Sequence, residues 1–211
     1  AYDRGGTRAN AKEAEAVAQA VMEHAQLHPK LSLGVVAFST AQRQAVQDAL
    51  ELKRKENSAL EPFFKTTLAE PFFVKNLENV QGDERDVIFI SIGYGRTAEG
   101  YISMHFGPLN NEGGEKRLNV LITRARLRCE VFTNITADDI DISRTGSAGV
   151  KALKSFLQYA QKGVLDVPQI TGKQADSPFE ESVAQKLAQL GYKVHRQVGS
   201  KGFFIHLAIE D

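Results

Sequence analysis

Two continuous apolar runs constrain the fold of this chain most strongly. The first is LGVVAF at Leu33–Phe38, and the second is DVIFISI at Asp86–Ile92. Short runs of this kind, with no alternation of polar residues, are typical of strands buried on both faces of a sheet. Helical patterns precede and follow the first run, at Asn10–Leu27 and Ala41–Leu52. We therefore expect an α/β fold in which helices cover both faces of a parallel sheet.

A change of pattern divides the chain into two parts. The alternation of strands and helices continues to about residue 165, and residues 166–176 then contain Pro168, Gly172 and several polar side chains. Such a segment favours a linker. Residues 177–211 show a helical pattern followed by two strand patterns. We expect one large domain over residues 1–165, a linker, and a small α/β unit that is truncated at its end.

Composition limits the classes of function. The chain has 26 basic and 26 acidic residues, so contact with a nucleic acid requires a local groove and not an overall field. Its single cysteine, Cys129, excludes a disulfide framework and a cysteine-based zinc site. We find no apolar run of the ~20 residues that span a bilayer and no signal peptide, so we expect a cytoplasmic protein with no membrane partner. Because the chain starts with Ala1, we interpret it as a fragment.

Phosphate chemistry is suggested by two sequence blocks, although the chain lacks the P-loop pattern GxxxxGK[ST] that wraps a nucleotide's phosphates. One block is VQGDERDVIFISI at Val80–Ile92, where a polar Gln-Gly turn precedes a strand. The other is RLNVLITRAR at Arg117–Arg126, where two arginines follow an apolar segment. A guanidinium group binds phosphate oxygens in bidentate fashion. Taken alone, each block also fits a simpler interpretation: a turn before a buried strand, and a surface arginine pair on an amphipathic helix.

Together these blocks resemble the motifs of superfamily 1 helicases of the Upf1-like group. VKNLENVQGDERDVIFISI is similar to motif V, RLNVLITRAR to motif VI, and LGVVAFSTAQRQAV at Leu33–Val46 to motif IV. The early YDRGGTRANAKEAEAV is similar to the segment that leads into motif IV in bacterial members. The resemblance covers about Tyr2–Asn134, and order and spacing agree. It implies the second RecA-like domain of a helicase, of the P-loop NTPase type but without the P-loop itself.

The resemblance implies roles for five residues at a nucleotide site. ATP and Mg²⁺ would lie between this domain and a first RecA-like domain of the same protein. Arg124 matches the arginine finger, which reaches the γ-phosphate and stabilises the charge that develops in phosphoryl transfer. Gln81, Gly82 and Glu84 match the motif V positions that couple nucleotide and nucleic acid, with Glu84 toward the ribose. Arg126 would support the site from behind.

Motif IV implies a nucleic-acid contact at Ser39, Thr40 and Gln42. As neutral donors facing the sugar-phosphate backbone, these side chains suit sequence-independent tracking along a single strand, which we expect to be DNA. The alternative, that they only cap the following helix, stays open.

Residues 177–211 resemble the start of a Vsr-like restriction-endonuclease-fold domain. That resemblance matches Glu180 to a first acid and places a metal-binding Asp where this chain has His206. Because Mg²⁺ prefers hard oxygen ligands, we expect no metal site here, and Glu180 is a ligand only if the unit is a nuclease. We favour Glu180 as the capping-box partner of Ser177.

The sequence thus predicts the C-terminal motor half of an ATP-dependent DNA helicase or translocase. It should be inactive alone because the Walker A and B motifs are missing. Two alternatives stay open. One is a non-catalytic nucleic-acid-binding or interaction module that keeps the motifs as scaffold, and the other is a nuclease that the helicase part delivers.

Overall fold

The computed structural model describes residues 1–163, 169–170, 178–200 and 203–210 of the 211-residue chain. The chain divides into two compact units, residues 1–157 and 158–211.

The first unit is built on a four-stranded sheet with the order β2-β1-β3-β4. Its strands are β1 (Leu33–Ala37), β2 (Phe73–Asn76), β3 (Arg85–Ser91) and β4 (Ala125–Phe132). All three neighbouring pairs are parallel. The expected parallel α/β sheet is confirmed.

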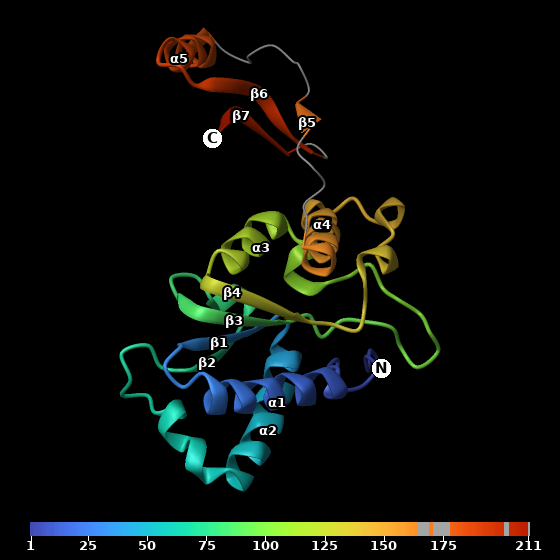
Figure 1. Ribbon diagram of the computed structural model, residues 1–211. Helices are drawn as coiled ribbons and strands as arrows, with labels where there is room; N and C mark the ends of the chain where they lie inside the picture. Colours follow the sequence, from blue (N-terminus) through green and yellow to red (C-terminus); the bar gives the residue numbers. More distant parts are fainter. Residues whose placement is uncertain (164–168, 171–177, 201–202, 211) are drawn as a thin grey trace. The chain divides into compact units, whose positions relative to one another are not determined.

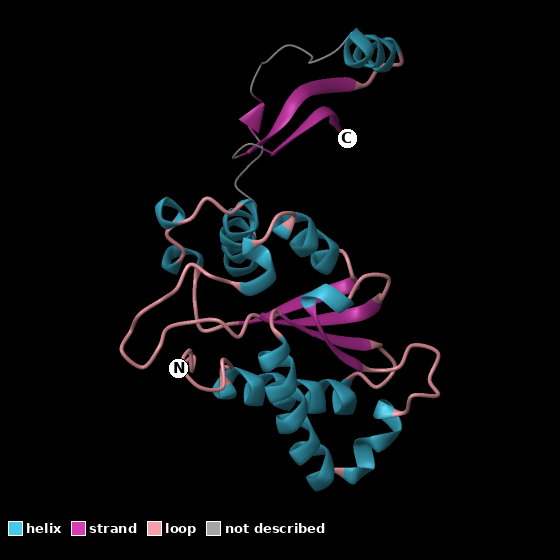
Figure 2. Cartoon of the chain, turned by 180° about the vertical axis from the view of Figure 1, so that it is seen from behind, coloured by secondary structure: helices cyan, strands magenta, loops and turns pink. Residues whose placement is uncertain are grey.

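Helices cover both faces of this sheet (Figures 1 and 2). On one face lie α1 (Ala11–Leu27) and α2 (Thr40–Glu56), and on the other lie α3 (Gly114–Ile122) and α4 (Ala148–Lys162). Five short 3₁₀ helices occur in the connections: η1 (Ser58–Phe64), η2 (Leu77–Asn79), η3 (Gly107–Asn110), η4 (Ala137–Asp139) and η5 (Ile142–Arg144).

The central strands are buried because their side chains alternate between two hydrophobic clusters. Val36 and Ile90 pack on the α3 and α4 side, whereas Val35 and Phe89 pack on the α1 and α2 side. None of the four is more than 2% exposed. Each such side chain contributes roughly 1.5–3 kcal/mol by leaving water, so the two clusters hold β1 and β3 firmly. The turns at the strand ends, which carry the predicted site residues, are therefore anchored to a rigid centre.

One strand begins earlier than its hydrophobic pattern indicates. The sequence favours a strand from Glu130, but β4 begins at Ala125. In the described sheet β4 is an outermost strand, so it carries charged side chains such as Arg126 and Arg128 next to exposed Leu127. Those residues hide the strand from a search for apolar runs.

The second unit combines one helix with a small antiparallel sheet. The helix α5 (Pro178–Gln189) accompanies β5 (Gln169–Ile170), β6 (Lys193–Ser200) and β7 (Phe203–Glu210), in the order β5-β6-β7. The predicted helix and hairpin are present. Within the predicted linker, Gln169 and Ile170 form a strand, and the other linker residues lie outside the described residues.

A search of the described residues for membrane-spanning helices gives a negative result, since none combines sufficient length with sufficient apolarity.

Candidate nucleotide and nucleic-acid contact sites

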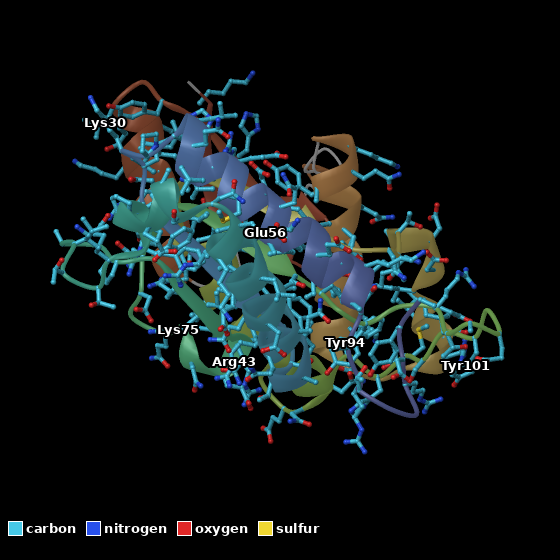
Figure 3. The ribbon with its side chains drawn as sticks, turned by 90° about the horizontal axis from the view of Figure 1, so that it is seen from below. Lys30, Arg43, Glu56, Lys75, Tyr94 and Tyr101 are labelled. Atoms are coloured by element: carbon cyan, nitrogen blue, oxygen red, sulfur yellow. The ribbon has the colours of Figure 1, made fainter. Side chains whose placement is uncertain are left out.

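The predicted site residues fall at opposite ends of the sheet. Because the strands are parallel, their amino ends lie together at one end of the sheet and their carboxyl ends lie together at the other. Lys30, before β1, and Tyr94, after β3, mark these two ends in Figure 3. Of the predicted nucleotide residues, Glu84, Arg124 and Arg126 form the amino-end site, whereas Gln81 and Gly82 lie in the connection between β2 and β3; the carboxyl-end site comprises Ser39, Thr40 and Gln42.

Arg124 and Glu84 lie side by side in the amino-end site. Arg124 Nη1 is 3.8 Å from Glu84 Oε1, and their side chains are 20% and 54% exposed. The Arg124 side chain also folds back along the last turn of α3, where Nε donates to Val120 O at 2.9 Å and Nη2 to Thr123 Oγ1 at 3.2 Å. Its backbone is fixed separately, because Arg85 N donates to Arg124 O at 3.1 Å. The fold thus joins a residue of the block that resembles motif V to a residue of the block that resembles motif VI.

Gln81 and Gly82 form an exposed turn beside a pocket. The turn closes through Asp83 N, which donates to Val80 O at 3.2 Å, and Gly82 has φ +88°. That left-handed conformation favours glycine at the third position of the turn. The pocket has a volume of about 460 Å³ and is lined by Leu77, Glu78, Gln81, Gly113, Lys116, Arg117 and Val120. Arg124 does not line this pocket, but its side chain donates a hydrogen bond to the carbonyl of Val120, which does.

Arg126 is engaged by carboxylates of its own chain. Its Nη1 donates to Glu70 Oε1 at 2.6 Å and its Nη2 to the other Glu70 oxygen, while Nε donates to Asp86 Oδ1 at 3.1 Å. Nη2 also donates to Ser32 Oγ at 3.2 Å. Hydrogen bonding to Arg126 lowers the pKa of Glu70 to about 2. No sequence pattern pointed to Glu70, which lies in a segment whose secondary structure is ambiguous from the sequence.

At the carboxyl-end site, Ser39 caps α2. Its Oγ accepts a hydrogen bond from Gln42 N at 3.1 Å, which confirms the capping interpretation for this residue. Thr40 is exposed, and its Oγ1 accepts from Asn76 Nδ2 at 3.3 Å. Two hydroxyl-bearing residues therefore stand at the beginning of a 17-residue helix, whose first N–H groups attract anions.

The burial of Gln42 contradicts the prediction that this side chain faces a nucleic acid, because Gln42 is 0% exposed. Its Oε1 accepts from Asn10 N at 2.8 Å, and its Nε2 donates to Ser91 Oγ at 3.1 Å and to Asn10 O at 3.3 Å. The amide points inward because it satisfies polar groups of two other segments, which the local pattern of motif IV does not reveal.

Glu13 completes a buried polar network with Gln42. Its Oε1 accepts from Ser91 Oγ and from Gly93 N, each at 2.7 Å, and its Oε2 accepts from Asn10 Nδ2 at 3.3 Å. Burial raises the pKa of Glu13 to about 7, although these hydrogen bonds act in the opposite direction. We call Asn10, Glu13, Gln42 and Ser91 the Glu13 network. The sequence identified only its capping box, in which Glu13 N donates to Asn10 Oδ1.

Among the residues that the structure describes, no group of three or more His, Cys, Asp or Glu side chains is arranged to hold a metal ion. Glu180 lies in α5 and His206 in β7, but their side chains are outside the described residues.

The four-stranded parallel sheet with helices on both faces is the fold of a RecA-like α/β domain of the P-loop NTPase type. More specifically, the chain belongs to a family described as an AAA domain, whose model matches residues 2–136. It is also similar to two uncharacterized ATP-dependent helicases. The relative from Mycoplasma pneumoniae is 37% identical over 157 residues, which are 72% of this chain and 14% of that protein. The relative from Mycoplasma genitalium is 39% identical over 137 residues, which are 63% of this chain and 12% of that protein.

These matches link the chain to superfamily 1 helicases and support a helicase-related role. The chain spans about one seventh of the length of these relatives.

Proposed function

We propose that this chain is the second RecA-like domain of an ATP-dependent helicase or translocase. In this proposal it supplies Arg124 to a triphosphate that a first RecA-like domain of the same protein binds. The observation that carries the proposal is the pairing of Arg124 with Glu84, which brings motifs V and VI together at one end of the sheet.

The location of this pair fits a domain that assists a nucleotide site without building it. In open α/β sheets, the strand carboxyl ends usually bind the ligand. Arg124 and Glu84 precede strands and lie at the amino end. Accordingly, the first RecA-like domain would cradle the phosphates and hold Mg²⁺, while this chain approaches from outside.

Each residue of the amino-end site then has a task. Bound ATP supplies the phosphoanhydride bond that is broken. Arg124 leaves its contacts with Val120 and Thr123 and donates to the γ-phosphate oxygens, where its charge stabilises the transition state. Glu84 accepts a hydrogen bond from a ribose hydroxyl. The exposed Gln81–Gly82 turn changes conformation when ATP is hydrolysed to ADP. Arg126 keeps its internal carboxylate partners and does not bind phosphate.

At the carboxyl-end site we propose contact with a single strand of DNA. Backbone phosphates would accept hydrogen bonds from the exposed hydroxyl of Thr40 and from the first N–H groups of α2, which begins after the Ser39 cap. Gln42 would act from the interior by fixing the helix start. These groups carry no base preference, which suits translocation.

Arg124→Ala tests the proposal in a protein that joins this chain to its first RecA-like domain. We expect nucleic-acid-stimulated ATP turnover to fall by about 10³-fold, because a finger contributes mainly to the transition state. Nucleotide affinity should change little. Arg128→Ala is the matched control, since Arg128 lies in the strand that directly follows Arg124 and pairs with Glu130. Unchanged turnover in Arg124→Ala would reject the finger.

Two further parts of the sequence interpretation are proposals. The family match ends at residue 136, so the endonuclease-like nature of residues 177–211 rests on sequence resemblance alone. The cytoplasmic location is likewise a proposal.

A further inference from the structure

A cluster of ion pairs lies directly beside the segment that carries Arg124. Arg126 contacts Glu70, Asp86 and Ser32, which come from three other segments of the chain. Ser32 precedes β1, Asp86 is the second residue of β3, and Glu70 precedes β2. Ser32 and Asp86 are joined as well, because Ser32 N donates to Asp86 Oδ2 at 2.9 Å and Asp86 N donates to Ser32 Oγ at 3.0 Å. Arg126 therefore ties β4 to its neighbours.

The pairing of β3 with β4 is irregular at this point. Arg85 lies opposite Ala125, and the next pair is Val87 with Arg128. Two residues of β4, Arg126 and Leu127, thus oppose one residue of β3, as in a β-bulge. Bulges redirect side chains and occur often beside active sites. Only Ala125 separates the bulge from Arg124, which precedes β4.

The Glu70 segment is itself firmly held. Arg85 is 8% exposed, and its Nη2 and Nε donate to Pro71 O at 2.6 and 3.1 Å. Its guanidinium also lies over the Phe73 ring, 4.7 Å from the centroid. A carboxylate next to such an anchor makes a rigid partner for Arg126, and bidentate pairing adds directional precision.

From this geometry we propose that Glu70 is a positioning residue for the arginine finger. The Glu70–Arg126 pair, with Asp86 and Ser32, fixes the bulge at the start of β4 and thereby the starting point and direction of Arg124. Glu70 touches neither nucleotide nor nucleic acid and acts only through Arg124. The proposal rests on the proposed function, because a positioning role requires that Arg124 takes part in turnover.

Glu70→Gln in the protein joined to its first RecA-like domain provides the test. Glutamine keeps the size of the side chain but loses the charge that holds Arg126. We expect kcat for ATP to fall about 10-fold with KM within about twofold, as for an interaction needed in the transition state. Glu61→Gln is the matched control, since Glu61 makes an equally bidentate contact with Arg54 on α2, at 2.8 and 2.6 Å. It should leave kcat unchanged.

The same substitution in an Arg124→Ala background separates positioning from general stability. If Glu70 acts through Arg124, the double variant turns over ATP at the rate of Arg124→Ala alone. A further loss in the double variant, or an unchanged kcat in Glu70→Gln alone, overturns the positioning role. Should Arg124→Ala alone leave turnover unchanged, the proposed function itself fails, and that result is distinct from the other two.

Discussion

The two ends of the sheet handle polar side chains in opposite ways. At the carboxyl end, the four members of the Glu13 network are at most 6% exposed and satisfy one another. At the amino end, the Arg126 and Glu70 side chains are 40% and 38% exposed, and Arg124 bonds mainly to its own helix. A closed network buries its polar groups, whereas the ion pair at the amino end remains in contact with water. Residues of one helicase-like motif set therefore divide into internal supports and outward contacts.

The largest effect on stability should come from the carboxyl end, where Glu13→Ala removes the acceptor for Ser91 Oγ, Gly93 N–H and Asn10 Nδ2. Leaving these buried donors without partners should cost roughly 3–4 kcal/mol of unfolding free energy. Urea unfolding of the chain at pH 6 would measure it. A loss below roughly 1 kcal/mol would mean that the network is not closed.

A nearly equal effect should appear as a pH dependence. The folded pKa of Glu13 is about 7, above its ordinary value of 4.5. Its contribution is therefore fully present below pH 4.5 and is lost as pH rises through 7, on the order of 3 kcal/mol in total. Glu13→Gln removes this titration. The free energy of unfolding of the variant should therefore rise relative to that of the wild type between pH 5 and pH 8. The pKa of His24 is lowered by burial and acts in reverse, weakening the fold as pH falls below 6.5, but it is common to both proteins.

Urea unfolding of the wild type and of Glu13→Gln, each at several pH values, measures this difference in the free energy of unfolding. If the difference in unfolding free energy between the two proteins stays constant from pH 5 to pH 8, Glu13 does not titrate in the folded state as described.

A smaller loss should follow from Gln42→Ala. This change deprives Asn10 and Ser91 of partners and should cost roughly 2 kcal/mol. Thr40→Ala, by contrast, should hardly change stability because Thr40 is exposed, but it should weaken binding of single-stranded DNA. Unfolding and fluorescence binding measurements on both variants sharpen the distinction between support and contact. If Gln42→Ala weakens DNA binding while leaving the fold unaffected, Gln42 is a contact after all.

At the amino end, the loss of an ion pair should change stability less than the loss of Glu13 or Gln42 does. Glu70→Gln breaks an ion pair whose members are more than a third exposed, so we expect roughly 1 kcal/mol or less. Thermal unfolding in low and high salt checks this, since added salt should reduce the difference. A loss as large as that of Glu13→Ala would remove the contrast between the two ends.

The general fold was predictable because its strongest determinants are local. The runs at Leu33–Phe38 and Asp86–Ile92 became β1 and β3, and the Asn10 cap began α1 as predicted. The direction of Gln42 was not predictable, since its partners Asn10 and Ser91 come from distant segments.

The same limit applies to the amino end. Glu70 lies far from Arg126 in the sequence, and nothing in the local pattern distinguishes it from other surface acids. The start of β4 was missed because edge strands lack a continuous apolar run. Motifs therefore indicated which residues gather, and tertiary contacts decided which of them face outward.

Binding of a transition-state analogue would report whether Arg124 acts as an arginine finger. In the protein joined to its first RecA-like domain, ADP with aluminium fluoride should bind more tightly than ADP alone. For Arg124→Ala we predict that this gain falls by about 10³-fold while ADP affinity stays within about threefold, because the finger acts on the transferring phosphoryl group. If Arg124→Ala keeps the full preference for the analogue, Arg124 is not an arginine finger and the account of the amino end is wrong.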